Sequence, residues 1–398
     1  MNLRVLFVTG EYPPLPGGIG EYTAQVAEGL ASAGLSVGVL TTQRVRPDTV
    51  AGGVVAVDAS IRHWGWSSFP AIRRALARGQ PDLVHIQYQA AAFGMHPAPH
   101  LLPWWLHRQR HVHVAVTFHD LRVPYLFPKA GPLRRRSLQL LAGSCDAIVT
   151  TNEADRRDLL GWTGTRGRGP EPVVIPLGNA APSLPLSASQ RAAMRSRLGA
   201  GEGDTLVCFF GLLNQSKGVE DLLHAVARLR DDGQPMRLLF LGGMAGASDP
   251  TDAAGLEQAR AQVAALGLDR LATWTGYLPR EELGPCLEAA DMAAFPYTDG
   301  ASLRRTSLIA ALSHGLPVVT TDPEDGAGGP LKHEENCLLV PRRDDASLAA
   351  ALRRLAGDAA LRARLAAGAR AAARPFDWDS VVAAHRRLYA SLGDGTPD

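Results

Sequence analysis

The sequence predicts an α/β protein with two doubly wound domains, each built on a parallel β-sheet. Its 398 residues exceed what one hydrophobic core normally holds, since domains of ~100–200 residues are usual. Both halves also open on a β-branched strand, a glycine-containing loop and an amphipathic helix, at residues 3–32 and 206–229. With 46% hydrophobic and 20% charged residues, the composition is that of a globular protein.

The first half alternates strands and helices after its opening βαβ unit. We expect strands at 3–9, 36–42, 54–57, 83–87, 112–117 and 146–151, and helices at 22–32 and 70–79. The loop between the first strand and helix contains Gly18-Ile-Gly20, but a dinucleotide fingerprint needs its glycines directly after the strand. The acid expected after the second strand is also missing, because Gln43 stands there. Such a glycine loop still suits close approach of a ligand to backbone amides.

The second half repeats this alternation with a different sequence. We expect strands at 206–211, 237–241, 271–278, 292–295, 316–321 and 336–341, and helices at 219–229, 253–266, 279–290, 302–314, 346–355, 361–373 and 376–392. Residues 179–187 are rich in Ala, Pro and Ser and are predicted to be a linker. We therefore place an N-terminal domain at 1–183, a C-terminal domain at 184–375 and a final helical segment at 376–398.

A candidate anion site lies where the helix at 302–314 is predicted to begin. Ser302 is the expected N-cap, because its hydroxyl can accept a hydrogen bond from a free amide of the first turn. Arg304 and Arg305 then fall in that turn, where the helix dipole favours acids. A bound phosphate would resolve this conflict. The alternative is a solvated charged turn.

Lys217 is a second candidate for phosphate binding. The chain has only three lysines, and this one directly precedes the helix at 219–229, so its ammonium group and the free helix amides would lie together. A solvated surface lysine is the alternative.

His119 and Asp120 follow the strand at 112–117, at the edge where open α/β sheets bind ligands. His119 is either an active-site residue or a structural histidine whose ring nitrogens are hydrogen-bonded within the fold, and both interpretations stay open. His85, inside its strand, is predicted to be structural.

Two clusters combine aromatic and basic residues. One contains Trp104, Trp105, Arg108 and Arg110, and the other contains Tyr125, Phe127, Lys129 and Arg134 to Arg136. Such clusters can rest on an anionic membrane, or they can be ordinary surface in which long side chains cover the core.

Composition excludes several other classes. A net charge of +2 and the lack of a long basic tract argue against nucleic-acid binding. The spacing of the four cysteines does not match that of metal ligands, so we expect them to be buried thiols in a reducing cytoplasm. They are Cys145, Cys208, Cys286 and Cys337. With no signal peptide and no apolar run near ~20 residues, we expect a cytoplasmic protein, at most peripheral at the inner face of the membrane.

Seven short motifs, each weak alone, are specific together. They are Pro16-Gly-Gly-Ile-Gly20, Thr117-Phe-His-Asp120, Lys217-Gly218, Gly276-Tyr-Leu278, Gly315-Leu-Pro-Val-Val319, Asn336-Cys-Leu-Leu-Val-Pro341 and Phe376-Asp-Trp378. With these motifs the chain resembles the glycosyltransferases of the GT-B fold, most closely family 4, along nearly its whole length. The resemblance implies two Rossmann-like domains facing each other across a cleft, with the last helix crossing back to the first domain.

The resemblance also implies a reaction and a set of site residues. The expected reaction is sugar transfer from a nucleotide-diphosphate-sugar co-substrate to an acceptor hydroxyl, with retention, without metal and without a further cofactor. We assign catalytic roles to His119, Lys217 and Arg305. Donor-binding roles go to Gly18, Lys217, Tyr277, Asp299, Gly300, Ala301, Ser302, Arg304, Arg305 and Ser307, and acceptor-side roles to Glu21 and Asp120. The acceptor is expected to be a glycan, a lipid-linked molecule or a small molecule of bacterial glycoconjugate biosynthesis.

The sequence departs from the family pattern at three positions. Two glutamates usually frame the helix start, and by alignment on Gly315 their positions hold Ser302 and Ala310. Leu212 stands where an arginine is usual. A bacterial branch of the family carries the same Gly-Ala-Ser-x-Arg-Arg pattern. Asp299, Ser302 and Ser307 are candidate replacements for the lost hydroxyl contacts, and Arg304 or Arg305 is a candidate replacement for the missing arginine. A non-catalytic nucleotide-sugar or partner-binding module and a sugar-nucleotide epimerase remain alternatives.

Overall fold

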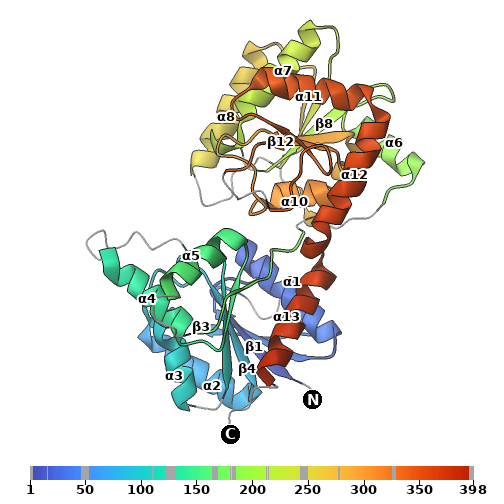
Figure 1. Cartoon of the computed structure of the whole chain (residues 1–398). Helices are drawn as coiled ribbons and strands as arrows, with labels where there is room; N and C mark the ends of the chain where they lie inside the picture. The colour runs from blue at the N-terminus through green and yellow to red at the C-terminus, as the bar shows by residue number, and fades with distance from the viewer. Residues whose placement is uncertain are drawn as a thin grey trace. The chain divides into compact units, whose positions relative to one another are not determined.

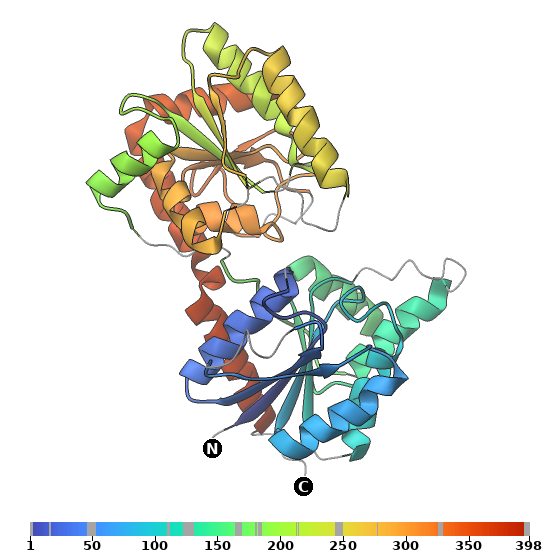
Figure 2. The same ribbon diagram turned by 180° about the vertical axis from the view of Figure 1, so that it is seen from behind.

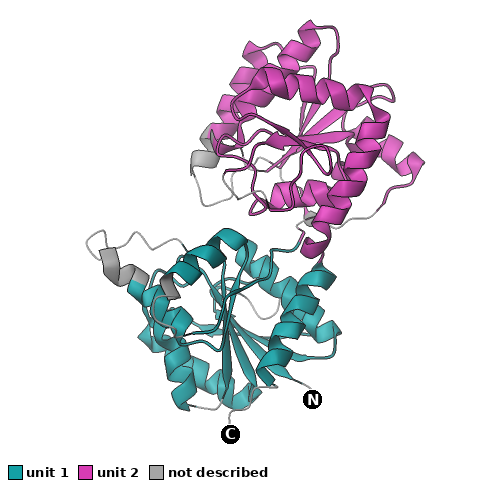
Figure 3. Ribbon diagram, viewed as in Figure 1, with its two compact units in different colours: residues 1–178, 378–398 teal, residues 179–377 magenta. Residues whose placement is uncertain are grey.

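The chain divides into two compact units, which Figure 3 colours separately. Unit 1 comprises Met1–Gly178 and Trp378–Asp398, and unit 2 comprises Asn179–Asp377. The computed structural model describes residues 3–15, 17–45, 53–109, 112–121, 131–163, 169–179, 181, 185–211, 213, 215–242, 250–276, 278–324 and 329–393.

Unit 1 is built on a parallel β-sheet. In the described part of the chain the sheet has seven strands in the order β3-β2-β1-β4-β5-β6-β7. Their bounds are β1 Arg4–Thr9, β2 Ser36–Thr42, β3 Ala56–Ile61, β4 Leu83–Tyr88, β5 His113–Phe118, β6 Ala147–Thr150 and β7 Val173–Val174. The strand order reverses between β1 and β4, and the carboxyl edge at such a switch point is where doubly wound sheets bind ligands.

Helices cover both faces of this sheet (Figures 1 and 2). Alternate β1 residues divide between them, because Val5 and Phe7 pack in the cluster of α1 and α13, whereas Leu6 and Val8 pack in that of α2, α3 and α4. The bounds are α1 Gly18–Ser32, η2 Trp66–Ser68, α2 Phe69–Gly79, η3 Ala98–Leu101, α3 Leu102–Gln109, α4 Gly131–Gly143, α5 Glu153–Thr163 and α13 Trp378–Gly393.

Unit 2 repeats this plan. Its described strands form a six-stranded parallel sheet in the order β10-β9-β8-β11-β12-β13. They are β8 Leu206–Phe210, β9 Arg237–Leu241, β10 Ala272–Trp274, β11 Met292–Phe295, β12 Val318–Thr321 and β13 Leu338–Val340. The helices are α6 Ala188–Arg197, η5 Gln215–Lys217, α7 Val219–Asp231, α8 Pro250–Ala265, α9 Arg280–Ala289, α10 Thr306–Ser313, α11 Asp345–Gly357, α12 Ala359–Ala373 and η6 Arg374–Phe376. The predicted α/β class with two doubly wound sheets is confirmed.

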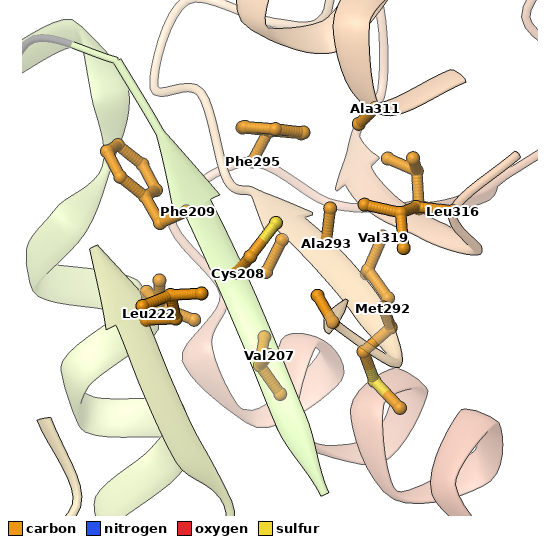
Figure 4. Close-up of a cluster of buried hydrophobic side chains, with 14 of the residues drawn as sticks. Val207, Cys208, Phe209, Leu222, Met292, Ala293, Phe295, Ala311, Leu316 and Val319 are labelled. Carbon is orange, nitrogen blue, oxygen red and sulfur yellow. The ribbon is translucent and has the colours of Figure 1, made fainter. Parts of the chain in front are cut away.

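The core of unit 2 surrounds its central strands. Figure 4 shows Cys208 and Phe209 on β8 beside Met292 and Phe295 on β11, and all four are fully buried. The four cysteines are free and buried, as predicted. Because Phe295 is fixed in this core, the loop that follows it starts from a rigid point.

The strand predicted at 54–57 is displaced in the structure, where β3 runs from Ala56 to Ile61. β3 is an edge strand that pairs only with β2 among the described strands. Its residues are mostly half-buried, so the local apolar pattern that was used to place it is weak.

None of the described helices is both long and apolar enough to cross a membrane.

Within the described residues, no three His, Cys, Asp or Glu side chains group as metal ligands would.

Candidate functional site

The turn between β11 and α10 forms one part of the candidate site. Helix α10 begins at Thr306 with Arg305 as its N-cap, so the prediction that Ser302 caps the helix is wrong. Ser302 instead accepts a hydrogen bond of 3.3 Å from the amide of Arg304, and its carbonyl accepts one of 3.1 Å from the amide of Arg305. These local bonds close a turn ahead of the helix, since serine readily bonds backbone amides close by in the chain.

Tyr297 brings the two predicted phosphate-binding cations together. The Arg305 guanidinium lies 3.9 Å from the centroid of the Tyr297 ring, and the Lys217 ammonium lies 5.3 Å from it. The two cations are therefore at most 9.2 Å apart, the sum of those distances. The negative face of an aromatic ring attracts a cation, so one ring holds both charges beside the start of α10.

The Tyr297 ring is itself fixed. It is fully buried, and its hydroxyl forms a hydrogen bond of 3.1 Å with the Ser307 hydroxyl on α10. Burial raises the pKa of Tyr297, so the phenol stays neutral. A buried, bonded ring is a rigid support for Lys217 and Arg305.

Gly218 allows the Lys217 segment to approach this loop. It has a φ of +65°, and a Cβ there would lie 1.8 Å from the Pro296 carbonyl oxygen. A backbone bond of 3.1 Å from the Thr298 amide to the Ser216 carbonyl joins the same two segments. The close approach needs a glycine, and it positions the neighbouring lysine.

Asp299 forms an ion pair with Arg305. The Arg305 side chain is only 15% exposed, whereas that of Asp299 is 56% exposed. Gly300 follows with a φ of +91°, and a Cβ there would lie 2.9 Å from the Asp322 carbonyl oxygen, so the turn packs tightly against the segment after β12. Ala301 is buried beside it. A phosphate that reaches Arg305 must compete with the Asp299 carboxylate.

His119 lies at the carboxyl end of β5 in unit 1. Its Nε2 is 2.8 Å from the Gln87 side-chain oxygen, so Nε2–H donates to that oxygen. Burial lowers the pKa of His119 to about 3, which leaves a neutral ring at physiological pH. No described residue bonds to Nδ1, whose lone pair is therefore an acceptor in this tautomer.

The beginning of α1 lies beside His119. The helix starts at Gly18 with Gly17 as N-cap, four residues before the predicted start at Tyr22, and its first turn is closed by a bond of 3.1 Å from the Glu21 amide to the Gly17 carbonyl. The Tyr22 ring meets the His119 ring edge to face, with centroids 5.1 Å apart. Gly18 and Glu21 thus stand within about one turn of a residue that touches His119.

The remaining predicted residues have separate surroundings. Asp120 accepts a hydrogen bond of 2.9 Å from Gln89. Arg304 is exposed. Tyr277 and Leu212 lie outside the described residues, as does the aromatic part of the second basic cluster, at positions 125 to 129.

A further set of buried polar residues links α13 to this region. His85 is fully buried between Tyr389 and Thr117, with bonds of 2.6 Å and 2.8 Å, so its predicted structural role is confirmed. The Tyr22 hydroxyl bonds the His385 ring at 2.9 Å.

Two site residues escaped the sequence analysis, Tyr297 and Gln87. Both stand at or just after the end of a buried strand, and that position was the available signal.

Comparison with protein families gives two matches. The model described as "Glycosyl transferase 4-like domain" matches residues 17–178, and that described as "Glycosyl transferases group 1" matches residues 204–358. Among curated relatives, the D-inositol 3-phosphate glycosyltransferase of Xylanimonas cellulosilytica is 28% identical, over 96% of this chain and 93% of its own. The enzyme of that name from Corynebacterium diphtheriae is 27% identical, over 99% and 95%.

Solved structures share the fold. Sucrose-phosphate synthase from Thermosynechococcus elongatus matches with a TM-score of 0.70 at 21% identity, over 99% of this chain and 100% of the other. HepE of Anabaena, solved in complex with UDP-glucose, matches with a TM-score of 0.73 at 17% identity, over 98% and 100%. A glycosyltransferase from Rickettsia africae matches with a TM-score of 0.77 at 14% identity, over 99% and 100%.

Proposed function

This chain belongs to the family 4 glycosyltransferases of the GT-B fold, and from that premise we propose that it moves a sugar from a nucleotide-diphosphate-sugar to an acceptor hydroxyl, with retention and without a metal ion. The membership confirms the family resemblance and the enzyme class predicted from the motifs. The donor, the stereochemistry, the metal independence and the residue roles form the proposal.

The pair of cations on the Tyr297 ring supports the proposal most directly. Cleavage of the sugar–phosphate bond leaves negative charge on the departing diphosphate. Lys217 and Arg305 would stabilise this charge as it develops, and the free amides at the start of α10 would add to the effect. A hydrogen bond to a charged group contributes about 1.5–3 kcal/mol, so losing one cation should slow the reaction roughly 10- to 100-fold.

We assign the other residues around this centre. Asp299, Ser302 and Tyr277 would contact the donor, held by the turn at Gly300 and Ala301, and Arg304 would extend the positive potential. Ser307 would act through the hydroxyl of Tyr297, to which it is bonded. On unit 1, Gly18 and His119 would face the donor, and Glu21 and Asp120 would face the acceptor.

Uridine diphosphate sugars are the first donors to test, because HepE was solved with UDP-glucose. Inositol 3-phosphate is the first acceptor, because it is named in the relatives. Glycan and lipid-linked acceptors follow. We propose a cytoplasmic location with peripheral contact of unit 1 at the inner face of the membrane.

The experiment measures release of nucleotide from a panel of nucleotide sugars, together with binding of the free nucleoside diphosphates by calorimetry. Lys217→Ala and the double variant Arg304→Ala/Arg305→Ala should each lower the rate of nucleotide release at least tenfold. Each should also lower the affinity for the free nucleoside diphosphate at least tenfold. Lys332→Ala is the matched control, because this lysine lies on the surface of the same unit and pairs with Glu335. Full turnover in the first two variants would refute the site.

Two further measurements test the finer points. Activity should be unchanged by a chelator, and the proton spectrum of the product should show the anomeric configuration of the donor. Loss of activity with chelator, or inverted product, would contradict metal independence or retention respectively.

A further inference from the structure

His119 is held at two points by neighbouring residues of β4. Its backbone amide donates a hydrogen bond of 3.0 Å to the Tyr88 carbonyl, and its ring Nε2 lies 2.8 Å from the Gln87 side-chain oxygen. β4 lies inside the sheet between β1 and β5, where Gln87 is in register with Thr9 on one side and Thr117 on the other. A central strand therefore sets the orientation of the His119 ring.

The two side chains differ in their access to solvent. Gln87 is fully buried, whereas His119 is half-buried at the carboxyl edge of the sheet. A substrate bound at this edge can reach the His119 ring, but it cannot reach the Gln87 amide. Any effect of Gln87 on the reaction must therefore pass through His119.

The Gln87 amide is not explained by stability. Its nitrogen Nε2 is buried and bonds to no described residue. A buried donor without a partner destabilises a fold, and an apolar side chain of the same length, such as methionine, would avoid this loss. The use of Gln87 therefore lies in the hydrogen bond that it does form, with His119.

That hydrogen bond selects one tautomer of His119. An amide oxygen only accepts hydrogen bonds, so the ring proton must lie on Nε2, and Nδ1 then presents a lone pair. With the proton on Nδ1 instead, the lone pair of Nε2 would face the lone pairs of the Gln87 oxygen. Nδ1 of the selected tautomer can accept a hydrogen bond from a hydroxyl group but cannot donate one.

The surroundings of His119 keep its ring neutral, because burial lowers its pKa to about 3. Tyr22 of α1 meets the ring edge to face. Burial lowers the pKa of His85 in β4 and of His385 in α13, and the nearby His119 ring contributes to both shifts. The adjoining carboxylate is Asp120, the next residue in the chain.

We propose that Gln87 is a positioning residue, which holds His119 as a neutral hydrogen-bond acceptor for a hydroxyl of the bound donor sugar. The assignment rests on the proposed function, in which His119 faces the nucleotide-sugar. Nδ1 would accept the hydroxyl proton in a hydrogen bond and so fix the orientation of the sugar. A site that pairs a substrate hydroxyl in this way discriminates against an analogue that lacks it.

Two substitutions separate this role from a structural one. Gln87→Met keeps the length of the side chain but offers no strong acceptor, so the ring proton should move to Nδ1, where it can bond to water. Gln87→Glu keeps an acceptor for Nε2–H. At about pH 8, kcat/KM for nucleotide release should fall about tenfold in Gln87→Met and less than about threefold in Gln87→Glu. A structural role predicts the opposite order, because a buried carboxylate destabilises a fold more than a methionine does.

The pH dependence of Gln87→Glu gives a second measurement. When the new carboxylate and His119 together take up one proton, that proton lies either on the ring or on the carboxyl group. In both cases Nδ1 becomes a donor, because the ring is then doubly protonated or accepts the carboxyl proton at Nε2. The negative charge favours the protonated ring, so this uptake moves to higher pH. The activity of Gln87→Glu relative to the parent should therefore fall about fivefold or more from about pH 8 to about pH 5.

Gln43→Glu is the matched control. It adds the same charge at the carboxyl edge of the same sheet, on the exposed residue that follows β2. Its pH profile should match that of the parent. Circular dichroism and unfolding temperature are measured for every variant.

A panel of monodeoxy analogues of an accepted donor tests the contact with the sugar. The analogue that lacks the contacted hydroxyl has nothing to donate to Nδ1. Its turnover should be low in the parent and should not fall further in Gln87→Met. The other analogues should show the full loss.

Nitrogen NMR of isotopically labelled histidine rings reports the tautomer directly, and His119→Gln identifies the signals. The ring proton should lie on Nε2 in the parent and on Nδ1 in Gln87→Met. This measurement needs no donor, and it does not depend on whether Gln87→Glu folds. The expected tautomers in a protein that turns over no donor would refute sugar transfer while supporting the role of Gln87 towards His119.

Four results would overturn the proposal. The first is a proton on Nδ1 of His119 in the parent protein. The second is activity of Gln87→Met at about pH 8 that equals or exceeds that of Gln87→Glu. The third is a pH profile of Gln87→Glu that follows the parent or the Gln43→Glu control. The fourth is an equal loss in Gln87→Met for every deoxy analogue.

Discussion

Replacing Gly218 by alanine tests how the Lys217 segment is held against the site. Gly218 is the N-cap of α7 with a φ of +65°, and an added Cβ would lie 1.8 Å from the Pro296 carbonyl oxygen. Contacts under 3.0 Å are essentially never observed for a Cβ, so the two backbones must separate by at least 1.2 Å. That movement would pull Lys217 away from the Tyr297 ring.

The loss of stability in Gly218→Ala has two parts, and the same substitution at a second glycine measures one of them alone. Gly233 follows the other end of α7 with a φ of +74°, but nothing lies within 4 Å of its added Cβ. Gly233→Ala should therefore cost only the left-handed conformation, about 1–2 kcal/mol. Gly218→Ala adds the forced separation, about 1–3 kcal/mol for an overpacked site, for a total of about 2–5 kcal/mol.

The assay is unfolding of each variant in urea and by heat, with calorimetric titration of UDP. For a unit of this size, 1 kcal/mol corresponds to about 2–4 °C, so Gly218→Ala should unfold roughly 5–15 °C below the parent. UDP binding should weaken in Gly218→Ala and stay at the parent value in Gly233→Ala. Equal destabilisation by the two substitutions, or unchanged UDP affinity in Gly218→Ala, would show that the close approach does not hold the lysine.

Three other predictions concern charge. Arg195 is buried and donates hydrogen bonds to three carbonyls and to a carboxylate, so Arg195→Met should lower the unfolding free energy of unit 2 by about 3–5 kcal/mol. Arg197 forms only an exposed ion pair, so Arg197→Met should lower it by less than ~1 kcal/mol, and urea titration measures both values. Asp299→Asn should tighten binding of free UDP about threefold at low salt, since it removes the competitor for Arg305. Free UDP lacks the sugar that Asp299 is proposed to contact, so weaker binding of UDP by this variant would contradict the competition. Burial lowers the pKa of His385 to about 3, below its unfolded value of about 6.5, so its stabilising effect is complete above pH 6.5 and falls as the pH drops towards 3, by about 2 kcal/mol at pH 5. His385→Gln should reduce the slope of the unfolding free energy against pH by the equivalent of up to about one proton taken up on unfolding. A slope equal to that of the parent protein would contradict this prediction.

Much of the fold could be predicted because the relevant signals are local. The strands ending in Thr9, Phe210 and Thr321 are short β-branched or aromatic runs, and such runs indicate buried parallel strands wherever they occur. Lys217 could be proposed as a phosphate-binding residue because it is a rare lysine at a loop end, and its ammonium group lies 5.3 Å from the Tyr297 ring.

The helix starts could not be predicted as well. The Ser302 hydroxyl had two possible amide partners, and the turn partner competes with the cap. At α1, glycine propensity argues against a helix at Gly18, but Ile19 and Tyr22 are buried in the first turns. This tertiary packing outweighs the local preference.

The contacts of the Tyr297 ring with Lys217 and Arg305 depend on packing between separate segments. Its ring joins a residue of η5 to the N-cap of α10, and sequence spacing carries no trace of that contact. The pairing of Tyr22 with His385 spans 363 positions and was equally invisible.

The last helix has a consequence for biosynthesis. Val381, His385 and Tyr389 of α13 are buried in the core of unit 1, although they leave the ribosome after every residue of unit 2. Unit 2 is one uninterrupted stretch that precedes α13 in the chain, whereas the core of unit 1 stays incomplete until α13 is added, because α1 covers that face of its sheet only in part. Until α13 has been synthesised, the nascent polypeptide carries an exposed apolar seam along α1 that this helix later covers.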